Sequence, residues 1–343
     1  MAAARETGSG DIPAGSPRAA AALLPLAPGV YRFRAAAGGV LYLGRATSLR
    51  RRVASYWGDL GDRRHLAAMV PRIAQVEAVV CDSAHEAAWL ERNLLQCRLP
   101  PWNRSPSGGQ EAEVWIRLSE SERTPGITVT REPASGDPSR YFGPYLGGQK
   151  VRDAVCGLAR VLPLGYTGSR PGGAEREMAR VRGASPGVRA GLTRAVTAVL
   201  ERDPAAVAAL RAELSGRRDA AAARLAFEFA ARLQAELDAL DWITGEQKVA
   251  RQDRADFDVH GWADGVLVRF EVRAGRLCGW RLRGCGPAAA RRYLAEPPPP
   301  AWADFARRNA ELAARLRSPR AELAARLRSP RAEWAARLKK GAE

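Results

Sequence analysis

The sequence predicts an α+β protein, in which a small antiparallel three-stranded sheet flanked by helices is followed by a helical hairpin and a short β meander. Short apolar strands and amphipathic helices follow one another over residues 23–104. Within the segment 203–250, an Ala-rich pattern of helical period runs from 203 to about 243, and within 251–290 apolar and polar residues alternate over 257–283. Periods of about 3.6 and 2 residues are typical of helices and strands, respectively.

Three strands are expected in the first segment. GVYRFR (29–34) and VLYLG (40–44) are rich in β-branched and aromatic residues and are joined through Gly38-Gly39, which is a hairpin signal. VEAVVC (76–81) is rich in valine, which is β-branched, and predicts the third strand. We expect the three to pair in one sheet.

Two helices are expected to flank this sheet. Ser48 suits the N-cap of a helix over 49–57. Ser83 followed three residues later by Glu86 forms a capping box, which predicts the start of a second helix. Pro100-Pro101 ends that helix, because proline lacks the amide hydrogen that a helix interior needs.

Residues 105–200 are interpreted as a connecting region. Within it, YFGPY (141–145) stands out as a compact aromatic motif, and the Gly-, Pro- and Arg-rich stretch 163–190 is expected to be mostly loop. Apolar patterns predict two strands and a helix at 114–118, 127–131 and 148–161.

The segment 203–250 predicts two antiparallel helices. A break is expected at Ser215-Gly216, because glycine disfavours the interior of a helix. Beyond this hairpin, the meander is expected to turn at 264–265 and 274–275. The second helix of the hairpin carries apolar residues at helical spacing: Leu225, Phe229, Leu233, Leu237 and Leu240.

The two ends of the chain have a simpler composition. Residues 1–22 are rich in Ala, Gly and Pro and predict a disordered tail. In 291–343, a stiff spacer at 297–300 precedes copies of AELAARLRSPR, which predict three short basic helices in a row at 310–320, 321–331 and 332–340. Recent tandem duplication and an auxiliary contact with nucleic acid are alternative explanations of this repeat.

The charge of the chain indicates a partner that carries phosphate. The 54 Lys and Arg residues exceed the 37 Asp and Glu residues, giving a formal net charge of +17. A basic surface of this size attracts nucleic acid, because neutralised phosphates release their counterions. A high-GC genome explains the preference for arginine over lysine but not the excess of positive charge.

Cysteine usage and hydropathy exclude several classes of protein. The five cysteines are scattered without a C-x2-C pair, so neither a disulfide framework nor a zinc site is expected. No apolar run approaches the ~20 residues of a membrane span, and residues 1–22 lack the apolar core of a signal peptide. We therefore expect a cytoplasmic protein without a membrane partner.

Glu91 is the most informative single residue. Helical spacing places it between Ala87, Leu94 and Leu95, within the apolar stripe of its helix. A buried carboxylate needs a cation, a metal ion or a proton. A structural ion pair with an arginine and a metal-binding role are both open at this point.

Four motifs occur in a fixed order and spacing: PGVYRF (28–33), LYLGRATSLRRRVASY (41–56), EAAWLERNLL (86–95) and PPWN (100–103). Together they resemble the catalytic domain of the GIY-YIG nuclease superfamily, and within it the UvrC group of bacterial excinucleases. GVY and YLG stand for the two tripeptides that name the superfamily. YFGPY is a further signature of the UvrC group.

The resemblance implies a division of labour in the site. Glu91 would hold one divalent cation, Mg²⁺ or Mn²⁺, with no other small-molecule cofactor. Arg52 would neutralise charge that builds up on the phosphoryl oxygens. Asn103 would position the site and Tyr56 would line it.

The implied water-activating residue is Tyr31 or Tyr42, which would orient or deprotonate the attacking water. A tyrosine base needs cationic neighbours that lower its pKa, and Arg45, Arg50 and Arg51 are the candidates. These arginines would also contact DNA phosphates. The position of Arg45 is usually lysine in this group; arginine keeps the charge but does not give up a proton.

Other parts of the chain resemble the same group in places. LAFEFAARLQAEL (225–237) resembles the hairpin through which UvrC proteins associate with their excinuclease partner UvrB, although Gln234-Ala235 replaces the usual Arg-Asp pair. Binding to UvrB and an independent hairpin are therefore both open. Cys156 stands alone where relatives carry a cysteine cluster, so no iron–sulfur cluster is expected. Asp258 matches a catalytic aspartate of an RNase H-like domain and is interpreted as a structural remnant.

These implications predict a metal-dependent endonuclease that nicks one strand of damaged or distorted DNA in nucleotide excision repair, on the 3′ side of the lesion. The alternative is a non-catalytic DNA-binding accessory paralogue of UvrC. A nuclease that acts on RNA or on mobile-element DNA is a third interpretation. YFGPY and the hairpin motif favour repair.

Overall fold

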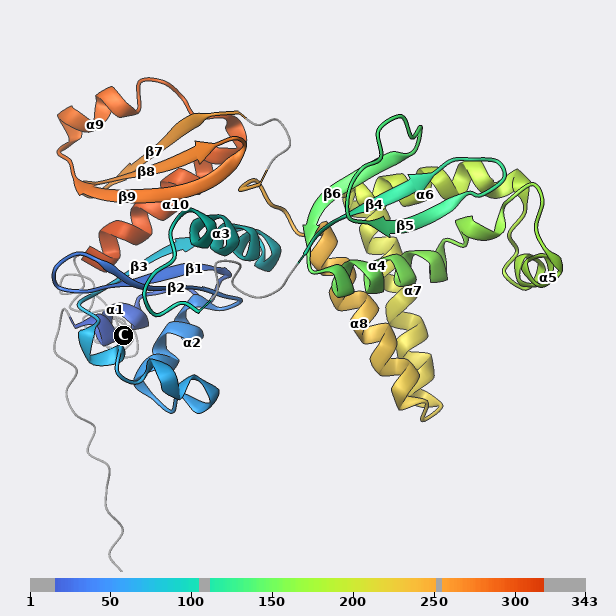
Figure 1. Cartoon of the computed structure of the whole chain (residues 1–343), viewed down its shortest axis with the longest axis horizontal. Helices are drawn as coiled ribbons and strands as arrows, with labels where there is room; N and C mark the ends of the chain where they lie inside the picture. The colour runs from blue at the N-terminus through green and yellow to red at the C-terminus, as the bar shows by residue number, and fades with distance from the viewer. Residues whose placement is uncertain (1–15, 105–111, 251–254, 318–343) are drawn as a thin grey trace, which may run out of the picture. The chain divides into compact units, whose positions relative to one another are not determined.

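The computed structural model describes residues 16–104, 112–250 and 255–317 (Figure 1). The chain divides into two compact units, one formed by Met1–Gly108 with Gln247–Glu343 and the other by Gly109–Glu246. The sequence predicted a separate domain for residues 23–104. Instead, this segment shares one unit with the meander and with a C-terminal helix.

The first sheet has the order β2-β1-β3, and all its pairs are antiparallel. The central strand β1 (Gly29–Arg34) pairs with β2 (Val40–Ala46) and with β3 (Gln75–Val80). This confirms the three predicted strands. Tyr31 lies opposite Gly44 of β2, which brings the two tripeptide motifs side by side.

Helices cover both faces of this sheet (Figure 1). α1 (Pro17–Ala22) and α2 (Leu49–Ala54) lie on one side and α3 (Ala84–Cys97) lies on the other. The predicted tail over 1–22 is thus wrong for Pro17–Ala22, because Ser16 caps this helix and its alanines are buried in the core. Residues 1–15 lie outside the described residues.

The two predicted N-caps behave differently. Ser83 Oγ accepts a hydrogen bond from Glu86 N at 2.9 Å, as the capping box predicts. The hydroxyl of Ser48 accepts no bond from the first turn of α2, and α2 continues as a 3-10 turn over Ser55–Trp57. The helix expected over 49–57 is therefore an α-helix only as far as Ala54 and a 3-10 helix beyond it.

The predicted meander is confirmed, with turns at Asp264-Gly265 and Ala274-Gly275 that have positive φ angles. It consists of β7 (Phe257–Ala263), β8 (Val266–Arg273) and β9 (Arg276–Gly284) in the order β7-β8-β9. The short helix α9 (Pro287–Tyr293) follows it.

The prediction of three short basic helices is wrong in its first part. Residues 310–317 instead continue one helix, α10 (Pro300–Arg317). Phe305 packs on Phe270 of β8 at a centroid distance of 5.0 Å, and Leu312 and Leu316 enter the core beneath the first sheet. Residues 310–317 of the first copy are therefore part of the core, and the rest of the repeat lies outside the described residues.

α10 also supplies hydrogen-bond partners for the backbone of β3, at the edge of the first sheet. Asn309 Oδ1 accepts a hydrogen bond from Val80 N at 2.7 Å, and its Nδ2 donates to Val80 O at 3.1 Å. A buried cluster of charges adds to this attachment, because Arg308 and Lys248 both pair with Asp82, and Lys248 Nζ lies 3.2 Å from Glu86. The C-terminal segment is thus fixed to the sheet by polar as well as apolar contacts.

The second unit has its own sheet, with the order β5-β4-β6. Its strands and its first helix follow the predicted pattern, and YFGPY lies in β6. The elements are β4 (Glu113–Ser119), β5 (Gly126–Thr130), β6 (Arg140–Leu146) and α4 (Gly148–Val161). The predicted loop over 163–190 contains the helix α5 (Gly173–Val181). Glu175 caps this helix, because its Oε2 accepts a hydrogen bond from Gly172 N at 2.8 Å.

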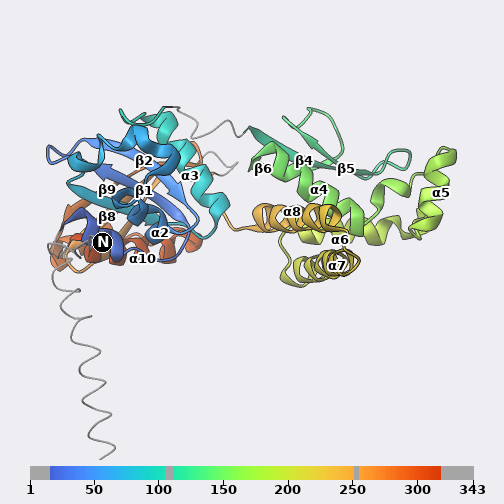
Figure 2. The ribbon, with the colours of Figure 1, turned by 90° about the horizontal axis from the view of Figure 1, so that it is seen from below.

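After α6 (Arg189–Leu200), the predicted hairpin is formed by α7 (Pro204–Ala223) and α8 (Phe227–Thr244), which lie side by side (Figures 1 and 2). The break predicted at Ser215-Gly216 is wrong. Strong helix formers on both sides carry α7 through this glycine, which costs only about 1 kcal/mol. The chain turns at Leu225 instead, where φ is 59°.

No helix in the described residues combines the length and the apolar character that a membrane crossing requires.

Candidate active site

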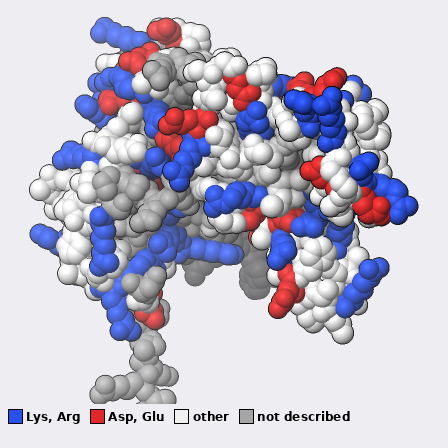
Figure 3. Space-filling model, turned by 45° about the vertical axis from the view of Figure 1, so that its right-hand side comes forward, with Lys and Arg blue, Asp and Glu red and all other residues white. Residues whose placement is uncertain are grey.

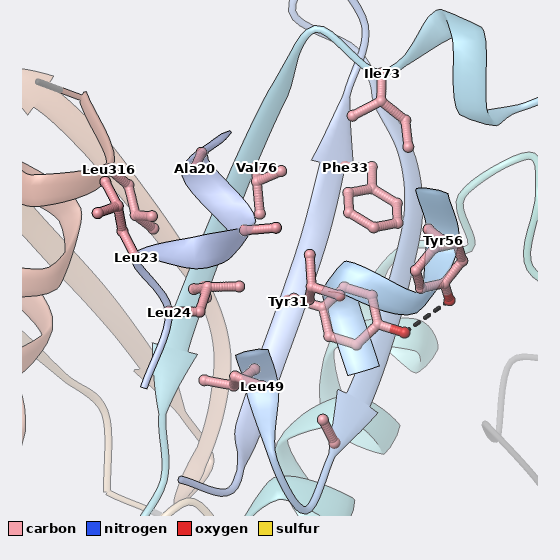
Figure 4. Close-up of a cluster of buried hydrophobic side chains, with 14 of the residues drawn as sticks. Ala20, Leu23, Leu24, Tyr31, Phe33, Leu49, Tyr56, Ile73, Val76 and Leu316 are labelled. Atoms are coloured by element: carbon pink, nitrogen blue, oxygen red, sulfur yellow. Dashed lines mark hydrogen bonds between the residues drawn. The ribbon is translucent and has the colours of Figure 1, made fainter. Parts of the chain in front are cut away.

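Three tyrosines from β1, β2 and the turn after α2 form the centre of the candidate site. The hydroxyl groups of Tyr31 and Tyr56 are hydrogen bonded at 2.7 Å (Figure 4). The Tyr42 ring lies 6.2 Å from the Tyr31 ring and 6.0 Å from the Tyr56 ring. A Cβ atom at Gly44 would lie 2.7 Å from Tyr31 Oη, so the glycine of YLG leaves the space that the Tyr31 ring occupies.

Arg52 of α2 is the cation nearest to these phenols. Burial lowers the pKa of its guanidinium, but the phenols of Tyr31, Tyr56 and Tyr42 raise it more, and the net shift is upward. Arg52 therefore remains a fixed positive charge beside the tyrosines. Such a charge can stabilise a negatively charged oxygen without any proton transfer.

The expected activation of the tyrosines by cationic neighbours is not found. Burial raises the pKa of Tyr31 well above its usual value of 10, and neighbouring phenols add to this effect. Burial and Tyr56 raise the pKa of Tyr42 as well, and Glu91 contributes in the same direction. Both phenols are therefore protonated at neutral pH.

Two of the arginines that were expected to act on the tyrosines are engaged or directed elsewhere. Arg50 Nε donates to the backbone oxygen of Leu24 at 2.6 Å, so it ties α2 to the segment after α1. Arg51 is exposed on α2. The arginine that lowers the pKa of Tyr31 and Tyr42 is Arg52, and its effect is smaller than that of burial.

Glu91 lies on α3 with a relative exposure of 8%, which confirms its predicted place in the apolar stripe. Arg45 contacts both oxygens of its carboxylate. The backbone N–H of Arg45 donates to Oε1 at 3.1 Å, and the Arg45 Nε lies 3.2 Å from Oε2. The ion pair with an arginine, left open by the sequence, is thus formed with a residue of the YLGR motif.

Asn103 fixes the free edge of β2. Its Oδ1 accepts from Leu43 N at 3.0 Å, and its Nδ2 donates to Leu43 O at 2.8 Å. Both polar atoms of the amide are thus used by the strand that carries Tyr42 and Arg45. Asn103 thus fixes this part of β2, and its role in the reaction stays a prediction.

The donor set around Glu91 suits a hard divalent cation. The described residues contain no group of three or more His, Cys, Asp and Glu side chains that could hold a metal ion. Mg²⁺ commonly binds through one or two carboxylates and keeps several water molecules. A single carboxylate beside neutral phenols therefore fits Mg²⁺ or Mn²⁺ better than a metal that needs a full set of protein ligands.

Asp258 of β7 belongs to a different cluster. Its carboxylate lies 2.7 Å from Arg269 and 3.0 Å from Arg273. Burial alone would raise the pKa of Asp258, but the hydrogen bonds from Arg273 and Arg269 lower it. Two guanidinium groups thus neutralise the carboxylate, and the interpretation of Asp258 as a structural remnant stays a prediction.

The contact between Arg45 and Glu91 was not foreseen from the sequence. A signal for it exists, because Leu41, Leu43 and Arg45 alternate along β2 and so share one face of the strand. Once α3 is placed on that face, Arg45 is the cation beside the apolar stripe of α3. The missing information was the side of the sheet that α3 covers.

Comparisons with known proteins identify the first segment. Residues 27–104 match the family model of the UvrC-like GIY-YIG domain. The chain is 38% identical over 142 residues to the UvrABC system protein C of Geobacter metallireducens, covering 41% of this chain and 23% of that protein. It is 33% identical over 274 residues to the protein of the same name from Gloeobacter violaceus, covering 75% and 43%.

The chain thus spans less than half the length of these curated relatives. A solved structure of the GIY-YIG N-terminal endonuclease domain of UvrC from Thermotoga maritima, bound to magnesium, is 30% identical. The match covers 25% of this chain and 94% of that one, with a TM-score of 0.24.

The raised pKa values of the tyrosines predict a loss of stability in alkaline solution. In the unfolded chain these phenols ionise near pH 10, whereas the folded protein keeps them protonated, so the free energy of unfolding falls as the pH rises above about 10. Replacing Tyr42 with Phe removes part of this loss. Urea unfolding of wild type and Tyr42→Phe at about pH 7, 9 and 11 measures it; an identical pH dependence of the two proteins would contradict the prediction.

Proposed function

Residues 27–104 form a UvrC-like GIY-YIG domain, and on this basis we propose that the chain is a metal-dependent endonuclease that nicks one strand of damaged or distorted DNA in nucleotide excision repair. The observation that carries the proposal is the buried carboxylate of Glu91, with an exposure of only 8%, beside the phenol of Tyr42, which in turn lies near the fixed charge of Arg52. DNA binding alone would not require this arrangement. We propose incision on the 3′ side of a lesion, as the resemblance implies.

Each side chain of the site has a role that follows from its surroundings. Glu91 would hold the divalent cation, which supplies polarisation of the scissile phosphate and stabilisation of the leaving oxygen when it is bound. Arg52 would neutralise the charge that develops on the other phosphoryl oxygens. Tyr31 and Tyr42 would orient the attacking water as neutral phenols, because burial raises the pKa of both.

The surface of the chain supports DNA as the substrate. In Figure 3, Lys and Arg side chains are scattered over the described residues among acidic and uncharged side chains. The formal net charge of +17 favours association with a polyanion at low ionic strength. This part of the proposal does not depend on catalysis.

One observation favours the accessory-protein alternative. The carboxylate that would hold the metal ion is already paired with Arg45, which lies 3.2 Å from its Oε2. If this ion pair is permanent, the chain would bind DNA without cutting it. Nicking assays with the isolated chain separate the two functions.

The hairpin of α7 and α8 supports a protein partner. Leu225, Phe227 and Phe229 at its turn are 73%, 65% and 42% exposed, whereas Leu233 and Leu237 of the same predicted stripe are buried. A cluster of large, solvent-exposed apolar side chains is typical of a protein interface. We propose that this turn binds UvrB. The absence of an iron–sulfur cluster stays a prediction.

Replacing Glu91 with Gln is expected to reduce nicking of a labelled, lesion-containing duplex by roughly 100-fold or more, because the amide carries no charge to hold the cation. The assay compares reactions with Mg²⁺ and with chelator, with and without UvrB. Asp258→Asn is the matched control, since it removes an equal charge from a cluster outside the site, and it should nick like wild type.

Two results would contradict this prediction. One is Mg²⁺-dependent nicking by Glu91→Gln at the wild-type rate. The other is no nicking by folded wild type while DNA binding is intact and sensitive to salt, which would favour the accessory protein.

Replacing Phe227 with Ser is expected to weaken binding to UvrB by about 10-fold or more, because an exposed aromatic anchor is lost from the interface. Val181→Ser is the matched control, since Val181 is 70% exposed on α5, elsewhere in the same unit. Surface plasmon resonance measures both affinities. Equal weakening by both variants, or by neither, would speak against the hairpin as the binding site.

A further inference from the structure

We infer that the guanidinium of Arg45 competes with the divalent cation for the carboxylate of Glu91, and that the cation displaces it when it binds. The inference rests on the proposed function, because it takes Glu91 as the residue that holds the cation. It assigns to Arg45 a contact that limits cation binding, in addition to the phosphate contact that the resemblance implies.

The two contacts between Arg45 and Glu91 differ in kind. The bond from the Arg45 backbone N–H to Oε1, at 3.1 Å, is fixed by the position of β2 and does not depend on the side chain. The contact from Arg45 Nε to Oε2, at 3.2 Å, belongs to a flexible side chain. The carboxylate can therefore keep its place on the strand while its second oxygen changes partner.

The exposure of the two side chains shows where the guanidinium can go. The Arg45 side chain is 30% exposed, whereas the Glu91 side chain is 10% exposed. The guanidinium thus lies on the solvent side of the carboxylate. Its withdrawal therefore takes it towards solvent and not through the core.

Electrostatic repulsion prevents the guanidinium and the divalent cation from binding Glu91 at the same time. A divalent cation on Oε2 and a guanidinium at hydrogen-bonding distance from the same oxygen would repel each other strongly, because the site is largely shielded from solvent. The cation therefore binds only to the fraction of molecules in which the guanidinium has left. Its apparent affinity is reduced by that fraction.

The released guanidinium has a natural second partner. A planar guanidinium matches a phosphate oxygen pair as well as it matches a carboxylate. A DNA phosphate placed against the cation would hold Arg45 away from Glu91. Cation and phosphodiester would then favour each other's binding, which is a coupling between two ligands of one site.

Mn²⁺ binding to the full chain without DNA, followed by electron paramagnetic resonance, tests the inference. Arg45→Gln is expected to bind Mn²⁺ roughly 10-fold more tightly than wild type, which is within the usual range of couplings between neighbouring sites. Arg98→Gln is the matched control: it removes the same charge at the exposed C-cap of α3 and should change the affinity by less than about 2-fold. Glu91→Gln should abolish the site.

Thermal unfolding gives a second readout that does not depend on activity. Arg45→Gln should lower the midpoint in metal-free buffer, because the buried carboxylate loses a partner, and Mn²⁺ should raise that midpoint more than it raises the wild-type value. Equal or weaker Mn²⁺ binding by Arg45→Gln would overturn the inference. So would an equal gain in Arg98→Gln, which would indicate net charge alone. Unchanged binding by Glu91→Gln would instead overturn the proposed function itself.

Discussion

The carboxylate of Glu91 is the constraint on which the candidate site depends. It is buried on α3 and needs a positive partner, because an uncompensated charge in such a place is costly. One of its oxygens is held by the backbone of β2 and the other faces a side chain that can leave. The same group can thus stabilise the packing of α3 on β2 and serve as a cation ligand. The packing of α3 against β2 brings Glu91 and Arg45 together and so forms the candidate site.

Two asparagine side chains close the two edges of the first sheet. Asn103 binds the backbone of Leu43 in β2, and Asn309 binds the backbone of Val80 in β3. Each amide replaces the strand that the edge lacks, so no buried backbone group at these points is left unpaired. Because Asn309 lies on α10, the C-terminal segment helps to hold the sheet that carries the tyrosines. The first sheet and the helices that pack on it therefore form one structural unit.

The sequence predicted many of the features that are encoded locally, although not the missing cap bond at Ser48 or the course of α7 through Gly216. Strand patterns, glycine turns and the capping box at Ser83 depend on neighbouring residues, and all of these were placed correctly. The apolar stripe of α3 also located Glu91, because a helix repeats its faces regularly. The contact of Arg45 with Glu91 and the burial of residues 310–317 depend on which distant surface an element meets. The composition of a basic, Ala-rich repeat does not distinguish a helix exposed to solvent from a helix packed in a core. The burial of this repeat was therefore not predictable from its composition.

The most direct test of the proposed metal site is the position of Mn²⁺ in a crystal of the chain, located by its anomalous scattering. We expect one peak beside Glu91, about 2.2 Å from a carboxylate oxygen, with the Arg45 guanidinium turned away from that oxygen. A crystal soaked in ample Mn²⁺ that shows no peak at Glu91, with the contact between Arg45 and Glu91 intact, would contradict it. The carboxylate would then be a structural partner of Arg45, and the chain would bind DNA without cutting it.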